Sequence, residues 1–150
     1  MRVFVVIDTN VLVSAMLKWD SIPGAIVDFA FCGLITPVLC DEIVHEYREV
    51  LLRSKFHLTD RIVSDVIEAL QEHAEFIDPK HIDLSIPDPD DAIFYEITLD
   101  NRKAGETYLV TGNLKHFPVD RYVVSPRQFF DIISRRLAQS ENNSDDTESE

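Results

Sequence analysis

The feature that most constrains the fold is an apolar run near the N-terminus, residues 3–7. Every residue in it is β-branched or aromatic, so a strand formed here would be apolar on both faces. Such strands are typical of the middle of a parallel sheet that helices cover on both sides. The run is followed by Asp8. It therefore predicts a central strand that places one acidic residue at the carboxyl edge of the sheet.

The rest of the chain alternates between short apolar runs and helical patterns. Further strands are expected at residues 34–39, 75–77, 107–111 and 122–124, and helices at 11–18, 23–32, 41–54, 59–74, 89–102 and 126–137. This alternation predicts an α/β fold with crossover connections. From residue 138 onward the chain is polar and acidic, so we expect one domain over residues 1–137 and an acidic disordered tail over residues 138–150.

The chain is strongly acidic. Its 150 residues contain 14 Lys and Arg against 27 Asp and Glu, a net charge of −13, or −8 without the acids of the tail. This balance argues against a protein that coats nucleic acid through bulk positive charge, but it permits a local acidic site for divalent cations. Two cysteines make no disulfide scaffold, and no stretch approaches the roughly 20 apolar residues of a membrane span. We expect a cytoplasmic protein with no membrane partner.

Polar side chains follow two of the expected strands. Asp8, Thr9 and Asn10 follow the first, and Thr111 and Asn113 follow the fourth. Ligands of open parallel sheets bind beyond the carboxyl ends of the strands, so these residues are candidates for a cation or phosphate site. At this stage Asp8 is equally well explained as the N-cap of the following helix.

Two further segments supply acidic residues. In the helix expected at 41–54, Glu46 lies at the edge of the apolar stripe, whereas Glu42 and Glu49 point further toward solvent. Asp88 and a following proline are typical of a helix start, which would place Asp90 and Asp91 in the first helical turn. Capping needs only one or two of these three acids, and the surplus indicates a cation nearby.

Convergence of Asp8, Glu46 and one of these aspartates would be unfavourable without a cation. Like charges about 4 Å apart repel by several kcal/mol at an effective dielectric constant of about 20. Such a cluster either protonates one member or binds a cation. Oxygen ligands suit Mg²⁺ or Mn²⁺ rather than Zn²⁺, and Mg²⁺ held by carboxylates is typical of phosphodiester hydrolysis.

These motifs, taken in order, resemble a PIN domain. The apolar strand with Asp8 to Ser14, the helix with Glu46, the helix start at Asp91 to Ile93, and residues 109–113 followed by His116 carry the resemblance. It extends over residues 3–134 and implies a three-layer α/β/α sandwich with a parallel sheet of about five strands in the order 3-2-1-4-5. It also implies a Mg²⁺- or Mn²⁺-dependent endoribonuclease that acts on single-stranded RNA. The most similar patterns are toxin components of prokaryotic toxin–antitoxin pairs, which implies a homodimer and a protein antitoxin as partner.

The resemblance also assigns roles to residues. It implies Asp8, Glu46, Asp91 and Asn113 as the catalytic set, with Asp8, Asp91 and Glu46 as metal ligands. Supporting roles fall to Thr9, Asn10 and Thr111. The family often has Asp where this chain has Asn113; a neutral amide lowers the charge of the site and leaves open whether one or two metal ions bind.

An acidic protein that binds RNA needs local positive charge. We take Arg48, Arg53, Lys55 and Lys115 as the RNA-binding candidates, with Arg61, His116 and Arg121 as further basic residues nearby. Ordinary solubilising charges would explain the same residues. We expect weak, salt-sensitive binding.

Two other functions remain open from the sequence. A phosphatase of the haloacid-dehalogenase type also has an apolar strand that ends in Asp, but it requires a second Asp two positions later, where this chain has Asn10. The other alternative is a non-catalytic PIN-like module that binds RNA or protein, with a site weakened at Asn113.

Overall fold

A parallel sheet forms the centre of the protein. The computed structural model describes residues 2–80 and 86–148, and within them the strands pair in the order β3-β2-β1-β4-β5. The strands are β1 (Phe4–Ile7), β2 (Thr36–Leu39), β3 (Glu75–Phe76), β4 (Thr107–Val110) and β5 (Val123–Val124), and all pairs are parallel. The predicted α/β fold and the strand order 3-2-1-4-5 are confirmed.

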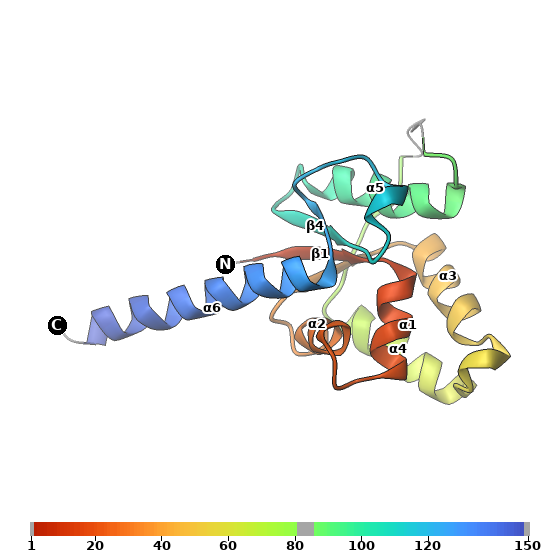
Figure 1. Cartoon of the computed structure of the whole chain (residues 1–150), viewed down its shortest axis with the longest axis horizontal. Helices are drawn as coiled ribbons and strands as arrows, with labels where there is room; N and C mark the ends of the chain where they lie inside the picture. The colour runs from red at the N-terminus through yellow and green to blue at the C-terminus, as the bar shows by residue number, and fades with distance from the viewer. Residues whose placement is uncertain (1, 81–85, 149–150) are drawn as a thin grey trace.

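Helices cover both faces of this sheet (Figure 1). One face carries α1 (Thr9–Leu17), α2 (Ile22–Phe31), α4 (Asp60–Glu72) and the first part of α6 (Pro126–Glu148), while α5 (Pro89–Asn101) covers the other. The remaining helix, α3 (Asp41–Leu51), lies at the carboxyl edge of the sheet, between α1 and α5. This edge is the right-hand side of Figure 1.

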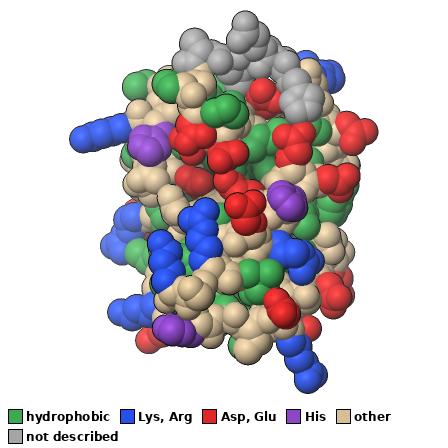
Figure 2. Space-filling view, turned by 90° about the vertical axis from the view of Figure 1, so that its right-hand side faces the viewer, with side chains coloured by type: hydrophobic (Ala, Val, Ile, Leu, Met, Phe, Trp, Pro, Cys, Tyr) green, Lys and Arg blue, Asp and Glu red, His purple; other side chains and the backbone are tan. Residues whose placement is uncertain are grey.

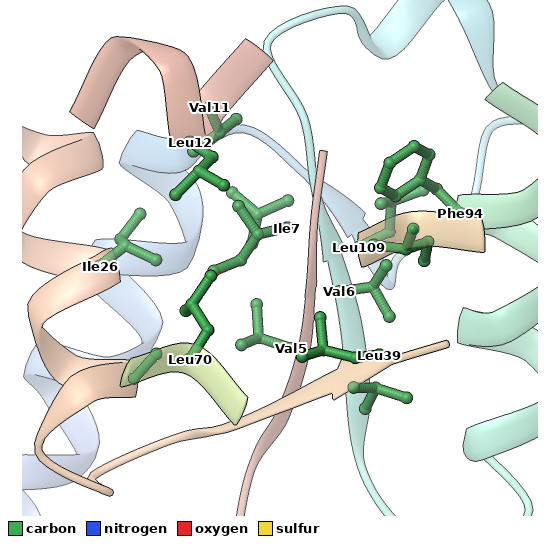
Figure 3. Close-up of a cluster of buried hydrophobic side chains, with 14 of the residues drawn as sticks. Val5, Val6, Ile7, Val11, Leu12, Ile26, Leu39, Leu70, Phe94 and Leu109 are labelled. Atoms are coloured by element: carbon green, nitrogen blue, oxygen red, sulfur yellow. The ribbon is translucent and has the colours of Figure 1, made fainter. Parts of the chain in front are cut away.

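The core lies on both sides of β1, as its apolar sequence predicts. All four residues of the strand are buried, and their side chains alternate between the two faces. Figure 3 shows Ile7 on the side of Leu12 and Ile26, and Val6 on the side of Phe94 and Leu109. Full burial of such a side chain contributes about 1.5–3 kcal/mol, so β1 is held by two cores at once. The end of β1 is therefore a firmly fixed point.

Helix α5 begins as its sequence predicts. The Asp88 side chain accepts a hydrogen bond from the backbone N–H of Asp90 at 2.9 Å, and Pro89 occupies the first helical position. Residues 93–98 are all buried, so the helix cannot rotate without exposing core residues. This packing fixes Asp91 in the first turn, at the same edge of the sheet as Asp8.

Two helix boundaries differ from the expectations by more than two residues. The helix expected at 41–54 ends at Leu51, and a 3₁₀ turn, η1 (Ser54–Phe56), follows because Arg53 has an extended backbone conformation. Helix α6 continues to Glu148 through most of the segment expected to be a disordered tail, and Figure 1 shows it extending away from the domain. Leu137 still packs against the core, whereas residues 138–142 are exposed. A domain boundary near residue 137 stays a prediction.

In the ranges that the structure describes, no helix is both long and apolar enough to cross a membrane.

Candidate active site

Asp8 is held by the register of the sheet. Ile7 of β1 pairs with Val110 of β4, so the residues that follow these strands lie side by side. The hydroxyl of Thr111 donates a 2.7 Å hydrogen bond to Oδ2 of Asp8, and both side chains are buried. Asp8 occupies the N-cap position of α1, yet its carboxylate makes no capping hydrogen bond. The side chain of Asp8 therefore does not act as the N-cap of α1.

Burial raises the pKa of Asp8 above its ordinary value of 3.8. The hydrogen bond from Thr111 opposes this shift, and the negative charge of Asp91 adds to it. The pKa direction means that the ionised form of Asp8 is disfavoured where it stands. A positive charge at this place would reverse that preference.

Glu46 is brought to the same place by α3. The hydroxyl of Thr9 donates a 2.5 Å hydrogen bond to Oε2 of Glu46. The next residue, Tyr47, is fully buried, and its hydroxyl donates a hydrogen bond to the backbone carbonyl of Ile7, the last residue of β1. Through this hydrogen bond Tyr47 holds α3 against the end of the central strand. Glu46, the preceding residue, is thereby positioned beside Thr9.

The pKa of Glu46 is also raised. Burial is the largest cause, the Thr9 hydrogen bond opposes it, and the charges of Asp90, Asp8 and Asp91 add to it. Asp90 was not among the residues assigned from the sequence. It lies on the Glu46 side of the α5 helix start and lines a hollow of about 260 Å³ with Glu46.

Asp91 lies on the other side of the α5 helix start. Its Oδ2 is 3.3 Å from Nδ1 of His116, in the short 3₁₀ turn η2 (Leu114–His116). Burial and the charge of Asp88 raise the pKa of Asp91, while His116 opposes the shift. The sequence does not predict this contact with Asp91, although His116 follows the Asn113 motif by only three residues. That spacing is the signal that could have indicated it.

The side chains of Asn10 and Asn113 take no part in the hydrogen bonds described above for the acidic residues. The backbone N–H of Asn113 donates to the hydroxyl oxygen of Thr111 at 3.0 Å. Its side chain is half-buried and lines a hollow of about 280 Å³ together with Lys115 and His116. Asn10 is exposed on α1. Among the described residues, neither side-chain amide is hydrogen bonded to Asp8, Glu46 or Asp91.

The acidic residues fit Mg²⁺ or Mn²⁺ by their chemistry. They supply hard oxygen donors. Burial, and to a smaller extent neighbouring carboxylates, raise the pKa of Asp8, Glu46 and Asp91, and a bound cation would offset both effects. Among the side chains that the structure describes, in residues 2–80 and 86–142, no three acidic, His or Cys groups are close enough to enclose a metal ion as they stand. Mg²⁺ commonly keeps several waters and takes only one or two protein carboxylates, which suits this spacing.

Basic side chains border the acidic residues. Figure 2 views the carboxyl edge of the sheet and shows acidic side chains gathered in its upper half, with Lys and Arg side chains below and beside them. Arg53 lines the hollow that also contains Glu46. Lys115 lines a second hollow, of about 280 Å³, together with Asp91 and His116. Two of the four RNA-binding candidates therefore line hollows that also contain acidic residues, one in each hollow.

The other two candidates lie further along α3 and η1. Arg48 is exposed and donates a hydrogen bond to the hydroxyl of Ser64 at 3.2 Å. The ammonium group of Lys55 lies 5.1 Å from the centre of the Phe56 ring. Both are exposed, but neither lines a hollow with the carboxylates described above.

Comparison with known families agrees with this geometry. A family model described as PIN domain matches residues 4–115, which is most of the chain. The match begins in β1, ends in η2, and includes Asp8, Glu46, Asp91 and Asn113. No curated protein matches the chain. With a matching sheet order and a match of this length, the chain belongs to the PIN domain family.

Proposed function

We propose that this protein is a Mg²⁺- or Mn²⁺-dependent endoribonuclease that hydrolyses phosphodiester bonds of single-stranded RNA. PIN domains are generally nucleases, and they typically use divalent metal ions. The observation that carries the proposal is the meeting of Asp8, Glu46 and Asp91 at one edge of the sheet, where burial and neighbouring carboxylates raise the pKa of each. Three partly buried carboxylates this close together do not favour folding, so a bound cation accounts for them better than a stabilising role does.

In this proposal each residue has a distinct role. Asp8 and Asp91 would hold the cation, directly or through water. When bound, the cation supplies Lewis acidity toward the scissile phosphate and lowers the pKa of water beside it. Glu46, which the Thr9 hydroxyl orients, would position or deprotonate the attacking water. Thr111 keeps Asp8 in place, and Asn113 would face the substrate. The products would carry 5′-phosphate and 3′-hydroxyl ends.

The flanking basic residues supply the affinity for RNA. Arg53 and Lys115 line two different hollows that contain these carboxylates, so two phosphates of one RNA strand would each meet a basic side chain. This arrangement favours cleavage within a strand over removal of terminal nucleotides.

The proposal is tested with Asp8→Asn, which keeps the shape of the side chain and removes its charge. The matched control is Asp28→Asn, on the exposed face of α2. We expect Asp8→Asn to abolish Mg²⁺-dependent cleavage of a labelled single-stranded RNA, while Asp28→Asn cleaves like the wild type. Cleavage by the wild type should stop when EDTA is added. Undiminished cleavage by Asp8→Asn would rule out this mechanism.

The other functions give different results in the same assay. A phosphatase would release phosphate from a phosphomonoester and leave RNA intact, and a binding module would bind RNA without turnover. Asn10 is exposed, and the amide offers no carboxylate for the second acid that the phosphatase reaction needs.

The proposed biological role is that of the toxin in a toxin–antitoxin pair, acting in the cytoplasm as a homodimer and inhibited by a protein antitoxin. This role depends on the neighbouring gene. A short DNA-binding reading frame directly upstream, and growth arrest that its co-expression relieves, would support it. Absence of both would favour RNA processing instead.

A further inference from the structure

We propose that His116 is a positioning residue that orients Asp91 for the divalent cation. The inference rests on the proposed function, because it concerns the same cation. It starts from the 3.3 Å distance between Nδ1 of His116 and Oδ2 of Asp91.

The three acidic residues show a common pattern. Each has one carboxylate oxygen engaged by a side chain from a different element of the fold. Thr111 holds Asp8, and Thr9 holds Glu46. His116 stands in the same relation to Asp91. In every case a side chain from another part of the fold orients the carboxylate, as a group that positions a metal ligand does. Thr111, Thr9 and His116 are thus the three side chains that contact the carboxylates. From the sequence, only the two threonines were assigned a supporting role.

The backbone around His116 is fixed well enough for this role. Its N–H donates to the carbonyl of Asn113 at 3.0 Å, which closes the η2 turn. The next residue, Phe117, is buried in the core with 6% of its surface exposed. The imidazole therefore projects from an anchored turn, not from a loose loop.

A purely stabilising ion pair explains the contact less well. The His116 side chain is 56% exposed, and exposed pairs contribute little to stability. Asp91 is already favoured by its place in the first turn of α5. By contrast, hydrogen bonds to metal-ligating groups fix their orientation, and losing one typically costs about 10–100-fold in metal affinity. The contact between His116 and Asp91 is therefore expected to contribute more to cation affinity than to the stability of the fold.

The test compares His116→Ala with His116→Asn, whose amide nitrogen can take the place of Nδ1 as the donor to Asp91. The control is His73→Ala, an exposed histidine at the end of α4, remote from the acidic residues. Mn²⁺ affinity is measured by paramagnetic resonance titration without RNA, and thermal unfolding is measured without metal. We expect His116→Ala to weaken Mn²⁺ binding about 10–100-fold with an unchanged metal-free Tm. His116→Asn should recover most of the affinity, and His73→Ala should match the wild type.

Each other outcome overturns the inference. It is overturned by Mn²⁺ binding of His116→Ala that equals the wild type, and equally by an affinity loss that His116→Asn does not recover. A lower Tm of metal-free His116→Ala, large enough to explain its weaker Mn²⁺ binding, would show that the contact stabilises the fold and does not position Asp91. If the wild type itself binds no Mn²⁺, the proposed function fails as well, so the two failures are distinguishable.

Discussion

Thr111 and Asp8 are 103 residues apart in the sequence, yet the hydroxyl of one donates a 2.7 Å hydrogen bond to the carboxylate of the other. The contact follows from the parallel pairing of β1 with β4, because each residue directly follows the last paired residue of its strand. The position of Asp8 is thus set by the register of the central sheet. The hydrogen bond from Thr111 therefore orients Asp8 through the fold itself.

The first prediction concerns the Thr111 hydroxyl. Thr111→Val keeps the shape of this fully buried side chain but removes the donor to Asp8 and the acceptor of the Asn113 N–H. Loss of partners for such groups typically costs about 1–3 kcal/mol of unfolding free energy. The pKa of Asp8 should also rise further, since the lost hydrogen bond lowers it. Thr111→Ser, which keeps the hydroxyl, is the control.

We expect Thr111→Val to lower RNA cleavage about 10–100-fold at saturating RNA, and Thr111→Ser to lower it much less. Denaturant unfolding and single-turnover cleavage measure the two effects. Equal activity of the valine and serine variants would show that the hydroxyl does not act through Asp8.

The second prediction concerns the pH dependence of stability. Because burial raises the pKa of Asp8, the folded protein binds this proton more tightly than the unfolded chain does. The stability due to this group is therefore fully present below its unfolded pKa and is lost as pH rises through the folded pKa. Asp8→Asn carries no such charge. Metal-free Asp8→Asn should thus be more stable than the wild type at neutral pH.

The difference should shrink as pH falls toward the ordinary carboxyl value of 3.8. Denaturant unfolding in EDTA across this range measures it, with Asp28→Asn as the matched control. Added Mn²⁺ should reverse the order at neutral pH, since a ligand at about 100 times its Kd stabilises the folded state by about 2.7 kcal/mol. A wild type that is more stable than Asp8→Asn in EDTA at neutral pH would contradict the raised pKa.

The sequence predicted those parts of the fold that depend on strong local patterns. The apolar run of β1 identified the central strand, and Asp88 with Pro89 identified the start of α5. Strand order came from the resemblance to the PIN domain, because local patterns do not determine which strands become neighbours. The length of α6 was not predicted, since the sequence after residue 137 is polar and lacks the apolar periodicity that marks a packed helix.

The candidate site was predictable to a lesser degree. Asp8 could be selected because it ends a strand, and Glu46 because it lies at the edge of an apolar stripe. Asp91 was selected among three neighbouring aspartates only by the resemblance to the PIN domain. The contact between His116 and Asp91 joins a turn to a helix, and only the packing of η2 beside α5 creates it. Tyr47 belongs to the buried apolar face of α3, and the apolar pattern of that helix gives no sign of the hydrogen bond from its hydroxyl to the Ile7 carbonyl.

The third prediction concerns RNA binding. In an Asp8→Asn background, which prevents cleavage, Arg53→Gln and Lys115→Gln should each weaken binding of single-stranded RNA. The loss should be similar for different RNA sequences, because phosphate contacts carry no sequence information. Each change should also reduce the slope of log affinity against log salt by about 0.7, the value for one phosphate contact on a single strand.

The control for RNA binding is Lys103→Gln, an exposed lysine beyond the C-terminal end of α5, whose ammonium lies 3.8 Å from Asp100. Fluorescence anisotropy at several salt concentrations measures all three variants. An unchanged salt slope for both Arg53→Gln and Lys115→Gln would mean that the hollows beside the carboxylates do not receive RNA phosphates.

The last prediction concerns the attachment of α6 to the sheet. Arg136 binds both carboxylate oxygens of Glu106, the residue just before β4, and the hydroxyl of Tyr108 donates to the same carboxylate at 2.8 Å. The Arg136 hydrogen bonds hold the pKa of Glu106 below its ordinary value of 4.5. This stabilisation is therefore present above the unfolded pKa and is lost as pH falls through the folded pKa.

Glu106→Gln should lower the unfolding free energy by about 1 kcal/mol at neutral pH, since both side chains are about 30% exposed and solvent screens the pair. The difference from the wild type should disappear in acid, where Glu106 is protonated in both states of the wild type. Arg135→Gln, at the exposed neighbouring position, should leave stability unchanged. A double-mutant cycle of Glu106→Gln with Arg136→Gln isolates the pair. A coupling energy of zero at neutral pH would mean that α6 is held to the domain by its apolar contacts alone.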